Sequence, residues 1–294
     1  MCADDTRTLH RQHFQQGAKD ITMKNHTSIG RCRLPRKKQY MPSLVFAVLF
    51  GISIWGCFLL AQETIDWKSS WHNLLHYGRI LFLQPKRSDH LPIGELAYSL
   101  GISFALSILT TIGGAAIAFF LALGAARNIA PSGVVKIIRI ITAIIRSIPT
   151  IIWVLVFSVT INIGTDAAVI GMCFHSIAYL VKVFSESFEQ INRDTIDALR
   201  ACGAGFSGII TQAVIPVAAT SIISWTFFRF EINFINAVAI GAAAGSGGIG
   251  YYLFMAGNLY YDIREVGVIT YTIFGTVILL ELLSLRLRKG IKQH

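Results

Sequence analysis

Long segments without charged residues constrain this chain more than any other feature of its sequence. Residues 43–61 and 96–126 contain no Asp, Glu, Lys or Arg. A helix needs roughly 20 residues to cross the hydrocarbon core of a bilayer, and it satisfies the backbone groups that lipid cannot. Because 53% of the 294 residues are hydrophobic and only 14% are charged, the apolar surface exceeds that of a soluble globular protein. The sequence therefore predicts an integral membrane protein.

Four further segments are apolar enough to complete a membrane domain. Arg139 and Arg146 interrupt the segment 137–161, and the segment 167–184 ends near Lys182. We therefore predict an all-α, polytopic membrane protein with about six transmembrane helices. The predicted spans are residues 43–61, 96–126, 137–161, 167–184, 213–238 and 266–285.

Basic residues gather at the two ends of the chain. Nine Lys or Arg residues lie in the first forty positions, and four lie between 286 and 292. By the positive-inside rule both termini are predicted to be cytoplasmic, which agrees with an even number of spans. The stretch 185–212 then lies in the cytoplasm. The net charge of +10 is explained by this topology, so we expect no nucleic-acid partner.

Composition divides the chain into four segments. Residues 1–40 are polar and basic, so we expect a mobile cytoplasmic tail, and no short apolar core marks them as a signal peptide. Residues 41–95 hold the first span and an amphipathic extracytoplasmic segment. Residues 96–288 form the main membrane domain, with a cytoplasmic loop at 185–212, and residues 289–294 form the cytoplasmic C-terminus.

Neither the cysteines nor the histidines indicate a metal site. The five cysteines are scattered, and none belongs to a Cys-x-x-Cys pair, which argues against a disulfide framework or a zinc site. His72 and His76 have the i, i+4 spacing of a metal pair, but no third ligand is evident. His175 is interpreted as a hydrogen-bonded packing residue. We expect this chain to bind no metal or other cofactor.

The polar stretch 194–216 carries a spaced pattern of acidic, small and proline residues. Asp197-Ala-Leu is followed by Gly203, and Ile215-Pro216 closes the pattern. Small side chains permit the close approach of a partner, and glycine permits a sharp turn. One interpretation is an ordinary amphipathic loop helix capped by glycine. The other is a helix that docks on a cytoplasmic partner.

This pattern resembles the EAA loop of bacterial ABC importer permeases, which runs Glu-Ala-Ala, three residues, Gly, nine residues, then Ile-x-Leu-Pro. Here Asp197 replaces the Glu, Leu199 the second Ala, Ala213 the Ile and Ile215 the Leu, whereas the Gly and the Pro keep their places. In that family the loop forms a short helix that sits in a groove of the ATPase subunit. The resemblance implies a coupling role for Asp197, Ala198, Leu199, Ala201, Gly203, Gly205, Ile215 and Pro216.

Over roughly residues 90 to 290 the chain resembles the permeases of phosphonate ABC importers. The resemblance rests on four segments: Arg146-Ser-Ile-Pro149, Ala198-Leu-Arg-Ala-Cys-Gly-Ala204, Arg229-Phe-Glu-Ile-Asn233 and Gly245-Ser-Gly-Gly-Ile-Gly250. The glycine segment also resembles methionine and osmoprotectant permeases. It implies a type I ABC importer permease fold in the bacterial inner membrane and a homodimer of permeases. It also implies two ATPase subunits that bind ATP and Mg, and an extracytoplasmic substrate-binding protein. The implied cargo is phosphonate or a related oxyanion such as phosphite.

Charged and amide residues in the fifth span need an explanation, because a charge inside a membrane is costly. Arg229, Asn233 and Asn236 follow an i, i+4, i+7 stripe on one helical face, whereas Glu231 points elsewhere. We hypothesise that this face lines the translocation pathway and meets phosphonate oxygens. Alternatively, Arg229 and Glu231 are structural and pair with neighbours such as Arg146 or with the second permease copy.

A proline and a glycine-rich segment, which both interrupt helices, mark further candidate gate positions. Pro149 lies three residues after Arg146 and is predicted to bend the third span. The alternative for Arg146 is a packing or ion-pair role. Residues 241–250 hold too many glycines for a stable helix throughout, which favours a broken or re-entrant segment that includes Gly247 and Gly248. Packing of small residues between spans is the alternative there.

Catalysis by the chain itself is not expected. The glycine segment lacks the Lys-Ser or Lys-Thr of a phosphate-binding loop, and no set of nucleophile, acid and base is found. Two further function classes stay open beside the import of a phosphorus oxyanion. One is an ABC permease for another solute, such as an amino acid or a compatible solute. The other is a stand-alone secondary transporter, although no inverted repeat is evident.

Overall fold

The computed structural model describes residues 36–60, 66–88, 91–161 and 164–292, and every regular element within these ranges is a helix. The predicted all-α class is confirmed. Most of the predicted tail at 1–40 lies outside the described residues. The chain divides into two units, residues 1–70 and 71–294, and each is described by itself.

The first unit holds α2 (Arg36–Leu60) and the start of α3 (Trp67–Leu83). The apolar stretch of α2 from Met41 to Leu59 is long enough to span a membrane, as predicted for this segment. The carboxylate of Asp66 accepts hydrogen bonds from the backbone N–H groups of Lys68 and Ser69. These bonds satisfy two amides that have no partner within the helix, so α3 starts at this point.

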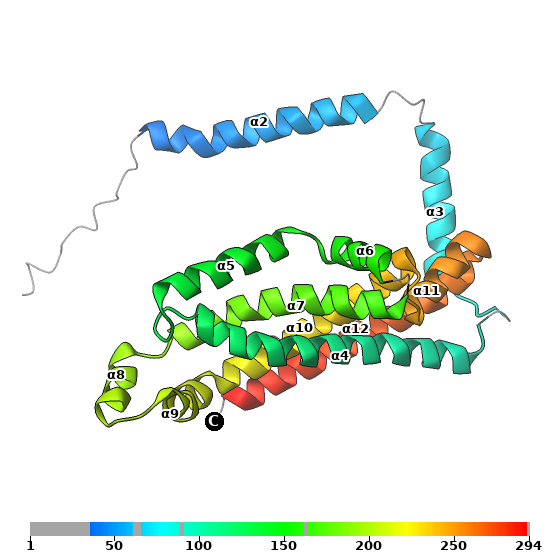
Figure 1. The fold of residues 1–294 in the computed structure, drawn as a ribbon. Coiled ribbons are helices and arrows are strands. Elements are labelled where there is room, and N and C mark those ends of the chain that lie inside the picture. Colours follow the sequence, from blue (N-terminus) through cyan, green and yellow to red (C-terminus); the bar gives the residue numbers. More distant parts are fainter. Residues whose placement is uncertain (1–35, 61–65, 89–90, 162–163, 293–294) are drawn as a thin grey trace, which may run out of the picture. The chain divides into compact units, whose positions relative to one another are not determined.

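Three long helices form the centre of the second unit (Figure 1): α4 (Ile93–Ala125), α7 (Thr165–Glu189) and α10 (Ile215–Ala244). The fourth long helix, α12 (Ile263–Lys292), packs against α10. Small residues set the approach of α4 to α7, because a Cβ on Gly114 would lie only 3.1 Å from the Cβ of Ser176. Helices in lipid associate through such close contacts between small residues.

Five helices in the described ranges are long and apolar enough to cross a membrane, and the bent pair α5 (Ser132–Ser147) and α6 (Thr150–Thr160) makes a sixth if it is counted as one span. The prediction of one bent helix over 137–161 needs correction, because α5 and α6 are separate helices that meet at 90°. Pro149 disfavours the helical conformation at Ile148, which has φ −100° and ψ 127°. Trp153 Nε1 donates to the Ile145 carbonyl oxygen at 3.0 Å across this bend.

The glycine segment breaks the helix, as its composition predicts. α10 ends at Ala244, and α11 (Gly248–Phe254) packs back against it before η2 (Met255–Leu259) leads to α12. Gly245, Gly247 and Gly248 have φ angles of +63°, +81° and +72°, which favour glycine. A Cβ on Gly250 would collide with the carbonyl oxygen of Val238. The turn therefore requires glycine both for its dihedral angles and for its packing.

Gly250→Ala is expected to lower the free energy of unfolding by about 1–3 kcal/mol, because the added methyl group meets backbone atoms that cannot move aside. Thermal unfolding of the purified protein in detergent measures this change. Gly101→Ala in α4 is the matched control, since nothing lies within 4 Å of its added Cβ. Equal unfolding temperatures for the two variants would contradict the packing argument.

Candidate functional site

α8 (Arg193–Ala201) is a short amphipathic helix at one end of the bundle (Figure 1). The side chain of Asn192 caps its N-terminus by accepting a hydrogen bond from the backbone N–H of Asp194 at 3.1 Å. Ile196 is buried, whereas Asp197 and Ala198 are exposed. One face of α8 therefore anchors the helix, and the opposite face is available to a partner.

A Schellman motif ends α8. The N–H of Gly203 donates to the Arg200 carbonyl and the N–H of Ala204 to the Leu199 carbonyl, both at 2.9 Å. Gly203 has a φ of +83°, which explains why this position needs glycine. Gly205 was expected to supply similar freedom, but its φ of −72° is open to any residue, and it precedes α9 (Phe206–Ile209).

Ile215 and Pro216 lie where a π-helical turn joins α10. In η1 (Ile210–Val214) the N–H of Ile215 donates to the carbonyl of Ile210. Proline has no N–H to donate, and the wider π turn lets the helix continue past it. α9, η1 and α10 therefore form one membrane span over 206–244.

Asp197 and Ala201 are exposed on α8, whereas Leu199 and Ala204 pack against the core beneath the helix. The Asp197 carboxylate lies 3.3 Å from Arg200 Nη1, and both side chains are more than half exposed. Such a pair contributes little to stability, which leaves the Asp197 side chain accessible. The structure thus gathers the predicted coupling residues around the α8 turn and the start of α10.

Arg229 is buried, with 2% of its surface exposed, against side chains of α7. Its Nε donates to Ser176 Oγ at 3.1 Å, its Nη2 contacts His175 Nδ1 at 3.0 Å, and its guanidinium lies over the Tyr179 ring at 5.1 Å from the centroid. Because arginine only donates, Nδ1 of His175 accepts and the ring proton sits on Nε2. These partners are uncharged, so they leave the guanidinium charge unneutralised. The interpretation of His175 as a hydrogen-bonded packing residue agrees with this contact.

Asn233, one turn further along α10, joins three helices. Its Nδ2 donates to Thr111 Oγ1 on α4 at 2.9 Å and to Ser176 Oγ on α7 at 3.0 Å. The Ser176 hydroxyl lies 2.6 Å from the Met172 carbonyl oxygen and donates to it. Arg229 and Asn233 therefore share one helical face, as their spacing predicts, and Ser176 links them. We call Arg229, Asn233, Thr111, His175, Ser176 and Tyr179 the polar cluster.

The polar cluster is enclosed in this conformation. α4 and α7 cover Arg229 and Asn233, so these two residues do not line an open pathway within the protomer, whereas Glu231 and Asn236 are half-buried. Sequence reasoning missed Thr111 and Ser176. The available signal was a hydroxyl side chain in the middle of an otherwise apolar span, which commonly marks a contact between helices.

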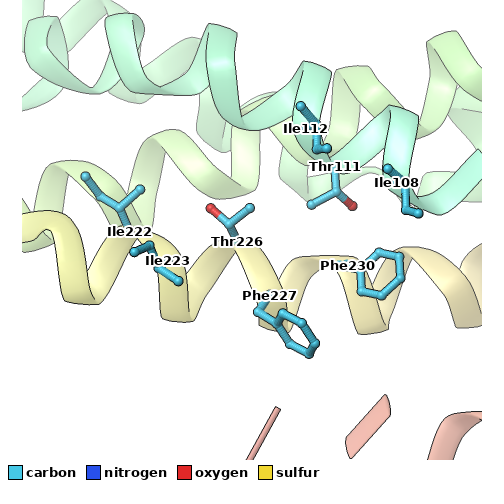
Figure 2. Close-up of a pocket in the computed structure, with 8 residues that line it drawn as sticks. All are labelled: Ile108, Thr111, Ile112, Ile222, Ile223, Thr226, Phe227 and Phe230. Atoms are coloured by element: carbon cyan, nitrogen blue, oxygen red, sulfur yellow. The ribbon is translucent and has the colours of Figure 1, made fainter. Parts of the chain in front are cut away.

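A cavity of about 480 Å³ lies beside the polar cluster, between α4 and α10 (Figure 2). Thr111 belongs both to its lining and to the hydrogen bonds of Asn233. Thr111 and Thr226 are the polar side chains of this lining, and the rest of it is apolar. The other lining residues are Ile108, Ile112, Ile222, Ile223, Thr226, Phe227 and Phe230.

Arg146 and Pro149 belong to the α5–α6 bend. Arg146 is half-buried and its Nε donates to the Thr142 carbonyl at 3.2 Å. With Lys182 and Glu186 it lines a small cavity of about 130 Å³. Pro149 is exposed. Arg146 thus lies beside the C-terminal half of α7.

Gly247 lies in the turn before α11, and Gly248 is the first residue of α11, at the opposite end of the bundle from α8 (Figure 1). Two hydrogen bonds hold this turn: Ile249 N donates to Ser103 Oγ on α4 at 3.1 Å, and Thr165 Oγ1 donates to the Ser246 carbonyl at 3.0 Å. The predicted coupling residues and the two glycines therefore occupy different ends, with the polar cluster on the helices that run between them.

Comparison with known families settles the class of the protein. The sequence model of the protein family described as "Binding-protein-dependent transport system inner membrane component" matches residues 118–293. The chain belongs to this family. It is therefore a multi-pass membrane permease subunit of an ABC importer, as the EAA-like pattern implied.

Two relatives carry names that concern phosphorus oxyanions. The phosphite transport system permease protein PtxC of Stutzerimonas stutzeri is 30% identical over 191 residues, which cover 65% of this chain and 69% of the relative. The phosphate-import permease protein PhnE of Mycolicibacterium smegmatis is 29% identical over 240 residues, which cover 81% of this chain. That match spans only 43% of the length of the relative.

Solved structures support the type I ABC importer permease fold. A chain of the MetNI methionine ABC transporter in an inward-facing conformation has a TM-score of 0.59 at 20% identity, covering 67% of this chain and 95% of the other. A chain of a bacterial alginate ABC transporter also has a TM-score of 0.59, at 13% identity, covering 87% of this chain and 98% of the other. At these identities the likeness concerns the fold.

Asn233→Ala is expected to lower the free energy of unfolding by about 1–3 kcal/mol, because buried hydroxyl groups on α4 and α7 lose their partner. Thermal unfolding in detergent measures the loss. Asn258→Ala is the control, since Asn258 is exposed and bonds only to the carbonyl of Phe254 in its own helical segment. A similar shift in both variants would show that Asn233 does not hold the three helices together.

Proposed function

We propose that the chain is the permease of an importer for phosphonate or a related oxyanion such as phosphite. The observation that carries this proposal is the buried guanidinium of Arg229, which has uncharged hydrogen-bond partners. The names of the 30% and 29% identical relatives support the same class of cargo. The chain works as a homodimer with two ATPase subunits and an extracytoplasmic substrate-binding protein.

In this proposal the chain performs no catalysis. ATP and Mg bind to the ATPase subunits, and both termini of the permease lie in the cytoplasm. The basic ends of the chain support this orientation through the positive-inside rule. α8 then lies on the cytoplasmic side, where its exposed face docks on the ATPase through Asp197, Ala198 and Ala201.

The chemistry of Arg229 suits a phosphorus oxyanion. A guanidinium presents a planar fork of donors that matches two oxygens of such a group, and the absence of water strengthens the interaction. Asn233 and Asn236 follow Arg229 on the same side of α10 and add amide donors. The anion replaces Ser176 or His175 as a partner of Arg229 once α7 and α10 separate.

Alternating access provides that separation. Closure of the ATPase subunits moves α8, and the continuous helix over 206–244 transmits the movement to Arg229. The bend at Pro149 beside Arg146 acts as a gate on the cytoplasmic side. The turn at Gly247 and Gly248 acts as a gate on the outer side.

Arg229→Lys is expected to lower phosphite or phosphonate uptake roughly ten-fold or more, equivalent to about 1.4 kcal/mol, because lysine keeps the charge but lacks the planar fork. Uptake of labelled substrate by cells or proteoliposomes with the complete transporter measures the effect. Arg286→Lys, an exposed position near the end of α12, is the control. Unimpaired uptake by Arg229→Lys and Arg229→Ala, with assembly verified, rules out a role of Arg229 in recognition.

Gly203→Ala is expected to reduce substrate-stimulated ATP hydrolysis severalfold, because a φ of +83° costs an alanine about 1–2 kcal/mol and shifts the end of α8. The measurement uses the purified permease–ATPase complex. Gly208→Ala is the matched control, because Gly208 lies in α9 and its added Cβ meets only the Ala204 methyl group at 3.4 Å. Full stimulation in Gly203→Ala would count against coupling through α8.

An amino acid or a compatible solute is the alternative cargo. Binding measurements on the partner substrate-binding protein discriminate between these solutes and a phosphorus oxyanion. ATP-independent uptake by the purified chain in liposomes would instead indicate a stand-alone transporter.

A further inference from the structure

A basic cavity lies at the end of the bundle that carries α8, away from the residues of the polar cluster. Its volume is about 510 Å³. Four cationic side chains line it: Arg127 after α4, Lys136 and Arg139 on α5, and Arg193 in the first turn of α8. The coupling and transport roles proposed above make no use of these side chains.

The cavity has more positive than negative charge. The Oε1 atom of Glu189 lies 2.6 Å from Arg139 Nη2 and 3.8 Å from Arg127 Nε. Across the described ranges, Lys136 and Arg193 have no ion pair. Four cations and one carboxylate leave three positive charges around one cavity. Like charges at close range repel one another, and a bound anion relieves that repulsion.

Part of the wall of the same cavity is apolar. Val135 and Ile140 belong to the lining, and Ile137, Ile141 and Ile144 on α5 are each more than half exposed. In a membrane domain, an exposed apolar stripe of this kind faces lipid acyl chains. The cavity therefore places cations beside a lipid-facing helical surface. This arrangement is expected for a site that binds an amphiphile with an anionic head group.

We propose that this cavity binds the phosphate headgroup of an anionic phospholipid. Lys136 supplies a compact charge, and Arg193 supplies a fork of donors to the phosphate oxygens. The isoleucine stripe of α5 contacts the acyl chains. Because Arg193 is the first residue of α8, the bound lipid links the membrane to the helix that docks on the ATPase.

Native mass spectrometry of the full-length protein, purified in detergent and mixed with phosphatidylglycerol or phosphatidylcholine, tests this proposal. The wild-type protein is expected to retain phosphatidylglycerol in preference to phosphatidylcholine. Lys136→Gln and Arg193→Gln are each expected to weaken phosphatidylglycerol binding about five-fold, which corresponds to ~1 kcal/mol per cation at an anionic lipid surface. Lys136→Arg keeps the charge and retains the lipid.

Arg286→Gln is the matched control, because it removes an exposed cation that is not among the lining residues. It is expected to retain phosphatidylglycerol as the wild-type protein does. Arg229→Lys is also expected to retain the lipid, which separates this proposal from the proposed transport function. If the wild-type protein retains phosphatidylglycerol and phosphatidylcholine equally, that result alone overturns the proposal.

Two other outcomes also overturn the lipid assignment. If inorganic phosphate displaces phosphatidylglycerol from the wild-type protein and binds alone with the same dependence on Lys136 and Arg193, the cavity recognises a soluble oxyanion. If both Gln variants retain the lipid but no longer copurify with the ATPase subunit, the cavity is a protein contact. Size-exclusion chromatography of each variant verifies that it is folded.

Discussion

The membrane interior offers no water to a buried polar side chain, and Asn233 meets this constraint by bonding to two other helices at once. Its amide group reaches Thr111 on α4 and Ser176 on α7. The close approach that these bonds require depends on small residues, since a Cβ at Gly114 would press on the Cβ of Ser176. The hydrogen bonds of Asn233 and the close packing of small residues therefore support one another at the centre of the bundle.

Ser176 connects this packing contact to the charge of Arg229. Its hydroxyl accepts from Arg229 Nε and Asn233 Nδ2 and donates to the Met172 carbonyl. A hydroxyl has one proton and two lone pairs, so these three bonds use its full capacity. If Arg229 turns toward an anion, Ser176 loses a partner and the contact between α7 and α10 weakens. The proposed recognition of an anion is thereby energetically linked to the proposed separation of the two helices.

Local patterns in the sequence predicted the features that depend on neighbouring residues. The helix end at Gly203, the broken helix at 241–250 and the shared face of Arg229 and Asn233 all follow from backbone dihedral angles or helical spacing. The 90° angle at Pro149 was not predictable, because proline interrupts a helix without fixing the direction of the next one. The enclosure of Arg229 by α7 also depends on contacts between distant segments, to which a single sequence gives no access.

The basic cavity also depends on contacts between distant segments, so it could not be predicted from the sequence. Its cations lie at positions 127, 136, 139 and 193, and in the sequence they are indistinguishable from the charges that set topology. Only the meeting of α5, α8 and the end of α4 brings them to one cavity. Conversely, Gly203 has a φ of +83°, whereas Gly205, two residues later, has an ordinary φ of −72°. Glycines close together in the sequence therefore need not share a structural role.

In the proposed mechanism, movement of α8 reaches Arg229 through the π turn before Pro216. Arg229 lies thirteen positions after Pro216, a rise of about 20 Å along a helix. Leu199 and Ala204 pack on the core beneath the junction, so a shift of α8 bears on the residues next to η1. Because proline removes a hydrogen bond at this point and the π turn has wider spacing, bending is least costly here. In the proposed mechanism the helix beyond it moves as a unit, and Arg229 is displaced relative to Ser176 without rearrangement of α10 itself.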